Sequence, residues 1–260
     1  MSLIGFSTGA LALGDFAGAL KVLRRTSMNA VELSALRLSE LPGLVNAISE
    51  LDLRQFSYIS FHAPSRFDKD EEDFVIELLH RVPENWPIIL HPDTIHAPEK
   101  WQEFGSQLAI ENMDRRKPLG RSAEELAHCF ERLPKAKLCL DLAHVHQFDR
   151  TMTEAYRMLK MFRERVCQLH ISELDSSGHH FPLSFGSMRA FMEVNSMIPV
   201  DSAAILESLN PFKGEEESAQ VNWIELEGMR AHQALGLGAH GDTSIPLTNS
   251  RRLRARTVPA

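Results

Sequence analysis

The stretch "KLCLDLAHVHQFD", residues 137–149, decides the fold. It is a short apolar run that ends in Asp141, and His144 and His146 follow closely. An apolar run of this length is typical of a buried strand, and ending such a strand in a carboxylate and imidazoles costs free energy unless these groups have partners. The same ending in other apolar runs would therefore indicate a shared site.

Short apolar runs recur along the chain, and segments with helical spacing lie between most of them. One of these segments opens with Ser122 and Glu125 in the spacing of a capping box. Strands that alternate with helices indicate a parallel sheet, and eight such units in 260 residues favour a closed barrel. The predicted fold class is α/β, a (β/α)8 TIM barrel formed by a single domain over residues 1–235, with an irregular tail over 236–260. The eight predicted strands are residues 3–7, 30–34, 58–62, 87–91, 107–111, 138–141, 166–170 and 203–207, and the predicted helices include 15–25, 72–82, 122–133, 153–166 and 222–235.

The composition indicates a globular cytoplasmic protein. The chain is 43% hydrophobic and 24% charged, and no apolar run approaches the roughly 18 residues that span a bilayer. The apolar N-terminus lacks the basic residues that open a signal peptide, and three scattered cysteines indicate reduced thiols. A net charge of −7 argues against a nucleic-acid partner, and the basic run 251–256 is interpreted as part of the tail. A homo-oligomer is compatible with all of this.

Six of the eight runs end in or just before a residue type that binds metals. The first two runs differ, because they end in Ser7 and Ser34, with Glu32 inside the second. All strand ends share one face of a barrel, and so many carboxylates and imidazoles there would cost several kcal/mol without a cation. The pattern predicts a divalent metal, with His144 reaching it from a loop after Asp141; mixed nitrogen and oxygen ligands favour Zn²⁺ or Mn²⁺. The six strand-end residues are His62, His91, Glu111, Asp141, His170 and Glu207.

An ordered series of motifs resembles the xylose isomerase-like TIM-barrel superfamily, which includes sugar-phosphate isomerases and epimerases and DNA-repair enzymes of the endonuclease IV type. The motifs are "FHAP", "LHPD", "IENMD", "LDLAHVH", "LHISELDSSGHHFPLSFG" and "ILES", and the resemblance covers over three quarters of the chain. It implies a metal set of Glu111, Asp141, His170 and Glu207.

The endonuclease IV-like branch implies further ligands, and with them one to three ions in total. The aspartate that this branch has two residues before its histidine is Gly178 here, and its glycine–glutamate–glycine segment reads "SFG". The third metal position therefore lacks its usual carboxylate, unless Asp175 or Glu173 supplies one. The implied further ligands are His62, His91, His144 and His180.

Three functions fit these residues. The favoured hypothesis is an isomerase or epimerase of a small sugar or sugar phosphate, with Glu111 and Glu207 as the catalytic acid and base. The first alternative is an endonuclease IV-like di- or tri-zinc phosphoesterase, and the short connection 63–71 argues against DNA as its substrate. The second alternative is a non-catalytic metal-binding barrel, suggested by Gly178. The expected partner is a small molecule, either a carbohydrate or a phosphorylated compound.

Overall fold

The predicted barrel is confirmed. The computed structural model describes residues 2–236, so all but the first residue of the predicted tail 236–260 lies outside the described residues. Eight parallel strands close in the order β1, β10, β7, β6, β5, β4, β3, β2. Each corresponds to one of the predicted apolar runs. They are β1 Ile4–Ser7, β2 Ala30–Ser34, β3 Tyr58–His62, β4 Ile88–Leu90, β5 Leu108–Glu111, β6 Lys137–Asp141, β7 Val166–Ile171 and β10 Ala203–Leu206.

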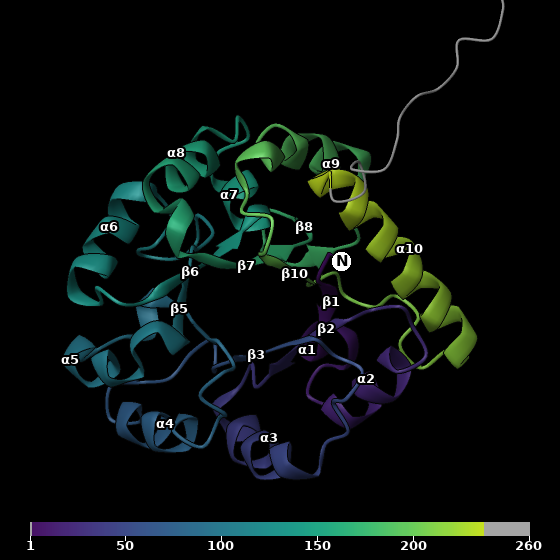
Figure 1. Cartoon of the computed structure of the whole chain (residues 1–260), viewed down its shortest axis with the longest axis horizontal. Helices are drawn as coiled ribbons and strands as arrows, with labels where there is room; N and C mark the ends of the chain where they lie inside the picture. The colour runs from purple at the N-terminus through teal and green to yellow at the C-terminus, as the bar shows by residue number, and fades with distance from the viewer. Residues whose placement is uncertain (1, 237–260) are drawn as a thin grey trace, which may run out of the picture.

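The helices form an outer ring around the strands (Figure 1). Helix α10 packs against both α9 and α2 and so joins the two ends of the ring; it begins earlier than predicted. A two-stranded hairpin, β8 Glu173–Leu174 and β9 His180–Phe181, follows β7 and was not predicted. The helices are α1 Thr8–Ala12, α2 Phe16–Leu23, α3 Leu41–Ala47, α4 Glu72–Leu79, α5 Pro98–Trp101, α6 Ala123–Arg132, α7 Leu142–Phe148, α8 Thr153–Phe162, α9 Phe185–Met192 and α10 Glu217–Leu235. Short 3₁₀ helices cover Leu38–Glu40, Ile48–Glu50, Pro92–Thr94, Gln102–Gln107, Arg163–Arg165 and Asn195–Met197.

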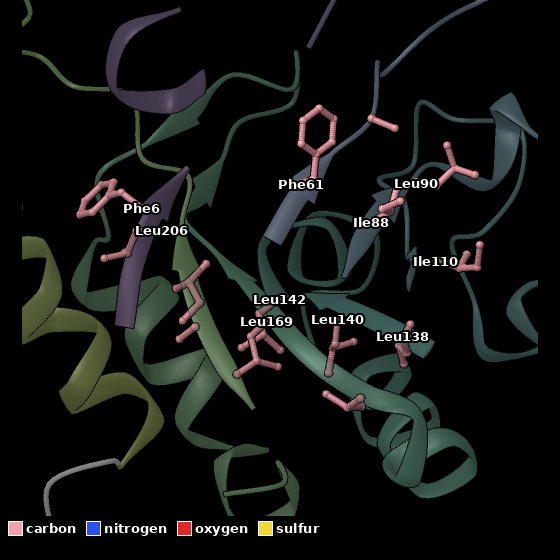
Figure 2. Packing of buried hydrophobic residues seen from close by; sticks show 14 of the residues in the cluster. Phe6, Phe61, Ile88, Leu90, Ile110, Leu138, Leu140, Leu142, Leu169 and Leu206 are labelled. Atoms are coloured by element: carbon pink, nitrogen blue, oxygen red, sulfur yellow. The ribbon is translucent and has the colours of Figure 1, made fainter. Parts of the chain in front are cut away.

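Successive side chains along each strand point in opposite directions, either to the core between the barrel and the helices or to the interior of the barrel. Leu138 and Leu140 of β6 belong to the main core between barrel and helices, which Figure 2 shows from close by. Cys139 and Asp141 alternate with them and point to the barrel interior, as the period of two requires. The same alternation on every strand brings one set of side chains to the inside of the barrel.

Strands β1 and β2 approach closely at Gly5. A Cβ atom at Gly5 would lie 1.7 Å from the carbonyl oxygen of Ala30, which is shorter than any non-bonded contact. Glycine is therefore required at this position for β1 to pair with β2.

The predicted start of α6 is confirmed but its capping box only in part, and the start of α7 differs from the prediction. Ser122 caps α6 by accepting from the backbone N–H of Glu125 at 3.3 Å, but the Glu125 carboxylate pairs with Arg121, so only half of the capping box forms. Helix α7 begins directly after β6, and Asp141 caps it by accepting from the backbone N–H of His144 at 2.7 Å. His144 therefore lies on a helix and not in the predicted loop. Over the described part of the chain, none of the helices combines the length and apolarity needed to span a bilayer.

Candidate metal centre

The eight predicted site residues converge at the carboxyl-terminal end of the barrel, around a cavity of about 260 Å³. A larger cavity of about 580 Å³, between α2 and α10, holds none of them. Asp141 and His170 are fully buried and do not line the smaller cavity. The six that line it are His62, His91, Glu111, His144, His180 and Glu207.

Glu111 stands at the centre of the cluster. Its Oε2 atom lies 3.2 Å from Nε2 of both His62 and His91. Its Oε1 atom lies 3.2 Å from Nδ1 of His170 and 3.3 Å from Nδ1 of His144. Each oxygen of one buried carboxylate thus faces a different pair of histidines.

Four of the residues could hold one cation together. Ligand atoms of Glu111, Asp141, His170 and Glu207 all lie within 4.8 Å of one another. Asp141 Oδ2 and His170 Nδ1 are buried and have no hydrogen-bond partner among the described residues. A buried polar atom without a partner costs about 1–3 kcal/mol, and a cation between these two atoms would satisfy both. The donor set therefore fits a divalent metal.

Glu32 of β2 was not predicted as a site residue. It is fully buried, and its Oε2 accepts from Nε2 of His170 at 2.9 Å and from Nε2 of Gln168 at 2.6 Å. An ionised carboxylate at this distance requires a proton of His170 on Nε2, so Nδ1, which faces the three carboxylates of the cluster, is the nitrogen that could give its lone pair to a metal. A carboxylate behind a ligating histidine is the usual arrangement in metal sites. The only sequence signal was a carboxylate on the inward face of a strand, between Ala30 and Ser34.

Backbone carbonyls orient two more histidines. His62 Nδ1 lies 2.7 Å from the carbonyl oxygen of Ala63, and His144 Nδ1 lies 2.9 Å from that of Asn112. Donation from Nδ1 leaves Nε2 of each ring as the nitrogen that could bind a metal, and in His62 this atom lies 3.2 Å from Glu111 Oε2. The Asn112 side chain in turn bonds the backbone of Asp141 in both directions, at 2.7 and 2.9 Å, and so ties β5 to β6 behind the cluster.

The carboxylates of the cluster cannot all be ionised together without a cation. Burial raises the pKa of Asp141 well above its usual value, and the charge of Glu111 adds to this. Burial raises the pKa of Glu207 to about 8. Burial also acts to raise the pKa of Glu111, but the charges of His170 and His91 outweigh it and hold this pKa well below its usual value. A divalent cation would replace the shared protons.

His180 lies at the edge of the cluster on β9. Its Nδ1 is 2.8 Å from Ser172 Oγ and 3.7 Å from Glu207 Oε2, and its ring is 5.8 Å from that of His144. Burial, followed by the charge of His144, lowers the pKa of His180 to about 3. His180 is therefore neutral, the form in which histidine binds metals.

Solved structures with the same fold include two whose descriptions name chemistry. A xylose isomerase-like TIM-barrel protein from Mycobacterium smegmatis in complex with magnesium has 12% identity and a TM-score of 0.53, with 85% of this chain and 89% of that chain covered. A proposed sugar phosphate isomerase/epimerase from Anabaena variabilis has 13% identity and a TM-score of 0.53, with 98% and 93% covered. A third structure, described as the crystal structure of AsfvAP:AG, has 12% identity and a TM-score of 0.54, with 90% of this chain and 99% of that chain covered. At these identities the likeness shows the fold alone.

The family is shown by the sequence itself. No curated protein matches the chain significantly. Residues 57–225, which run from β3 into α10 and include all eight predicted site residues, match the family model of xylose isomerase-like TIM barrels. The chain therefore belongs to the xylose isomerase-like TIM-barrel family.

Proposed function

We propose that this chain is a divalent-metal-dependent enzyme that isomerises or epimerises a small sugar or sugar phosphate. The proposal rests on a difference in position among the four residues Glu111, Asp141, His170 and Glu207. Glu207 and the buried Glu111 line the cavity, whereas Asp141 and His170 are buried and do not line it. Two members can therefore reach a substrate, and two can only hold a cation.

Zn²⁺ or Mn²⁺ would be held by Glu111, Asp141, His170 and Glu207, and when bound it would polarise the oxygens of a carbonyl or hydroxyl group on the substrate. Isomerisation then needs a carboxylate that removes a proton from the carbon next to the carbonyl and a second group that returns a proton to the product. Glu111 and Glu207 are the candidates, since both face the cavity. Glu32 keeps the Nδ1 lone pair of His170 directed at the cluster throughout.

The cavity suits a small substrate. Its volume of about 260 Å³ is below the roughly 300–1,000 Å³ of pockets for drug-sized ligands. Its lining combines apolar side chains with polar groups of both signs of charge, and these polar groups could bind a hydroxylated or phosphorylated compound. A flipped nucleotide held on a duplex would need longer loops than the segment between His62 and α4 offers.

A two-metal phosphoesterase is the second candidate, and Glu111 favours it. One oxygen of this carboxylate faces His62 and His91, and the other faces His144 and His170. This arrangement suits a carboxylate that bridges two ions, and paired ions roughly 3.5–4 Å apart are typical of phosphatases and nucleases.

Two measurements on the same preparation test the proposal. The protein is loaded with Zn²⁺ or Mn²⁺, and its metal content per chain is determined by elemental analysis. It is then incubated in D2O with aldoses, ketoses and their phosphates. Isomerase or epimerase activity puts deuterium on a carbon of the substrate, which NMR detects, while phosphoesterase activity releases inorganic phosphate.

Glu207→Gln should abolish deuterium incorporation. Its control is Glu103→Gln, which changes an exposed carboxylate outside the cavity and should have no effect. A protein that binds neither metal would contradict the proposal. Bound metal with phosphate release and no deuterium incorporation would favour the second candidate instead.

A further inference from the structure

The place of a third metal ligand is taken by an arginine. Gly178 stands where the endonuclease IV-like resemblance has an aspartate, in the turn between β8 and β9. A Cβ atom at Gly178 would lie 1.7–1.9 Å from the guanidinium carbon and both terminal nitrogens of Arg116. A side chain at 178 and the Arg116 guanidinium in its present position therefore exclude each other.

No neighbouring carboxylate replaces the missing ligand. Asp175 Oδ1 accepts from the backbone N–H groups of Ser177 and His179, so it holds the turn together. Glu173 Oε2 accepts from the backbone N–H of Ser184 at 3.1 Å, at the start of α9. The residues present do not fit a third metal next to His180, because the group placed there is a cation.

The guanidinium is held in position with donors to spare. Its Nε and Nη2 atoms donate to the buried carboxylate of Asp114 at 2.9 and 2.6 Å, and Nη1 donates to the carbonyl oxygen of Ser177. These bonds use three of the five N–H groups of an arginine, and no other described residue accepts the remaining two. Arg116 is thus preorganised and still able to bind a ligand.

A second cation lines the same cavity. Arg116 and Lys117 both line the cavity that holds Glu111, His180 and Glu207. Lys117 Nζ donates to Asp93 at 2.8 Å, which leaves two of its three protons free. The carboxylates of Asp114 and Asp93 hold the two cations at the wall of the cavity. Cations with free N–H donors at a cavity wall are the groups that bind a phosphate.

We propose that Arg116, with Lys117 beside it, binds the phosphate group of the substrate at the position that a third metal ion would otherwise occupy. The inference rests on the proposed function for the existence of a substrate, and it narrows that substrate to a phosphorylated one. It also limits the site to at most two ions. The phosphate is recognised by a fixed side chain, and the metal-bound end of the molecule lies toward Glu111 and Glu207.

Binding of inorganic phosphate, measured by isothermal titration calorimetry, tests the first part. Loss of a charge-assisted pair of hydrogen bonds in Arg116→Ala should weaken phosphate binding at least about tenfold. Arg115→Ala is the matched control, since this neighbouring arginine is exposed and does not line the cavity, and it should stay within about twofold of the wild type. Each protein is titrated with and without bound metal. Undetectable binding to the wild type, or equal binding to Arg116→Ala, would overturn the proposal.

Metal content tests the second part. Gly178→Asp combined with Arg116→Ala removes the guanidinium and restores a carboxylate at a φ of +83°, which aspartate tolerates better than most residues. The double variant should hold about one more ion per chain than the wild type, while Arg116→Ala alone should not. Thermal melting checks that each variant is folded, and if the double variant is not, the calorimetry decides alone. A folded double variant with no extra metal would contradict the exchange of arginine for metal. Absence of metal from the wild type would instead refute the proposed function.

Discussion

Replacing Glu32 by glutamine should weaken metal binding although Glu32 is not itself a predicted ligand. The Glu32 carboxylate is fully buried and accepts from His170 Nε2 at 2.9 Å, so it keeps the Nδ1 lone pair directed at Glu111, Asp141 and Glu207. A neutral amide is an acceptor of about half the strength, and it can present its nitrogen to His170 instead of its oxygen. Loss of such a partner typically costs about 10–100-fold in metal affinity, or about 1.4–2.8 kcal/mol. Complete burial excludes solvent screening, so we expect the effect to fall within this range.

The assay is competition with a chromogenic zinc chelator, which gives the dissociation constant directly. Tyr58→Phe is the control, because it removes a hydroxyl that donates to Gln168 Oε1 at 2.9 Å and leaves the bond between Glu32 and His170 intact. Its dissociation constant should stay within about twofold of the wild type. If Glu32→Gln binds zinc as tightly as the wild type, the orientation of His170 does not depend on Glu32, and our reading of its tautomer is wrong.

Three further predictions concern single positions. Asp141→Asn should keep the cap on α7, because an amide oxygen can still accept a hydrogen bond from the backbone N–H of His144. The affinity for zinc should fall at least about tenfold. Urea denaturation measures the stability of the fold, and chelator competition measures the affinity for zinc. Gly5→Ala should destabilise the fold by about 3 kcal/mol or more, because the new Cβ atom would overlap the backbone of β2. Gly43→Ala is the control: Gly43 lies in α3 with open space around it, so alanine there should stabilise the fold by up to about 1 kcal/mol. Thermal unfolding of the two variants measures both effects. Glu72→Ala should cost about 2–4 kcal/mol in urea denaturation, because this buried carboxylate accepts from Trp101 Nε1 at 2.8 Å and from two backbone N–H groups.

The fold could be predicted because its signal is local. Each strand is a short apolar run, each run is followed by helical spacing, and the number of units indicates closure. The first and last residues of individual helices and strands were predicted less well than the fold. The sequence prediction has a loop where α7 lies, because the first turn of α7 follows β6 with no connecting residues to mark the start of a helix. The β8–β9 hairpin has strands of two residues, too short for any periodicity to show.

The candidate ligands could be predicted for a related reason. The ends of all strands of a barrel lie on one face, so a residue that ends a strand in the sequence is expected at that face in the structure. Glu32 lies in the middle of a strand, and only its contact with His170, 138 residues away, shows what it does. Arg116 and Gly178 are also far apart in sequence, and both lie in connections whose paths no periodicity determines. Contacts between such segments depend on the folded structure and leave no pattern along the chain.

Gly178 has no side chain that could bind a metal, and in the sequence this suggests a non-catalytic barrel. In the structure, the Arg116 guanidinium fills the space that a side chain at 178 would occupy. The buried carboxylate of Asp114, which is 1% exposed, holds that guanidinium by two hydrogen bonds, and a buried carboxylate without this partner would cost several kcal/mol. Burial acts to raise the pKa of Asp114, but the hydrogen bonds from Arg116 outweigh it and lower this pKa, so the carboxylate is ionised at neutral pH. The absence of a side chain at 178 and the guanidinium that Asp114 holds there are therefore parts of one arrangement, which places positive charge at this edge of the cavity.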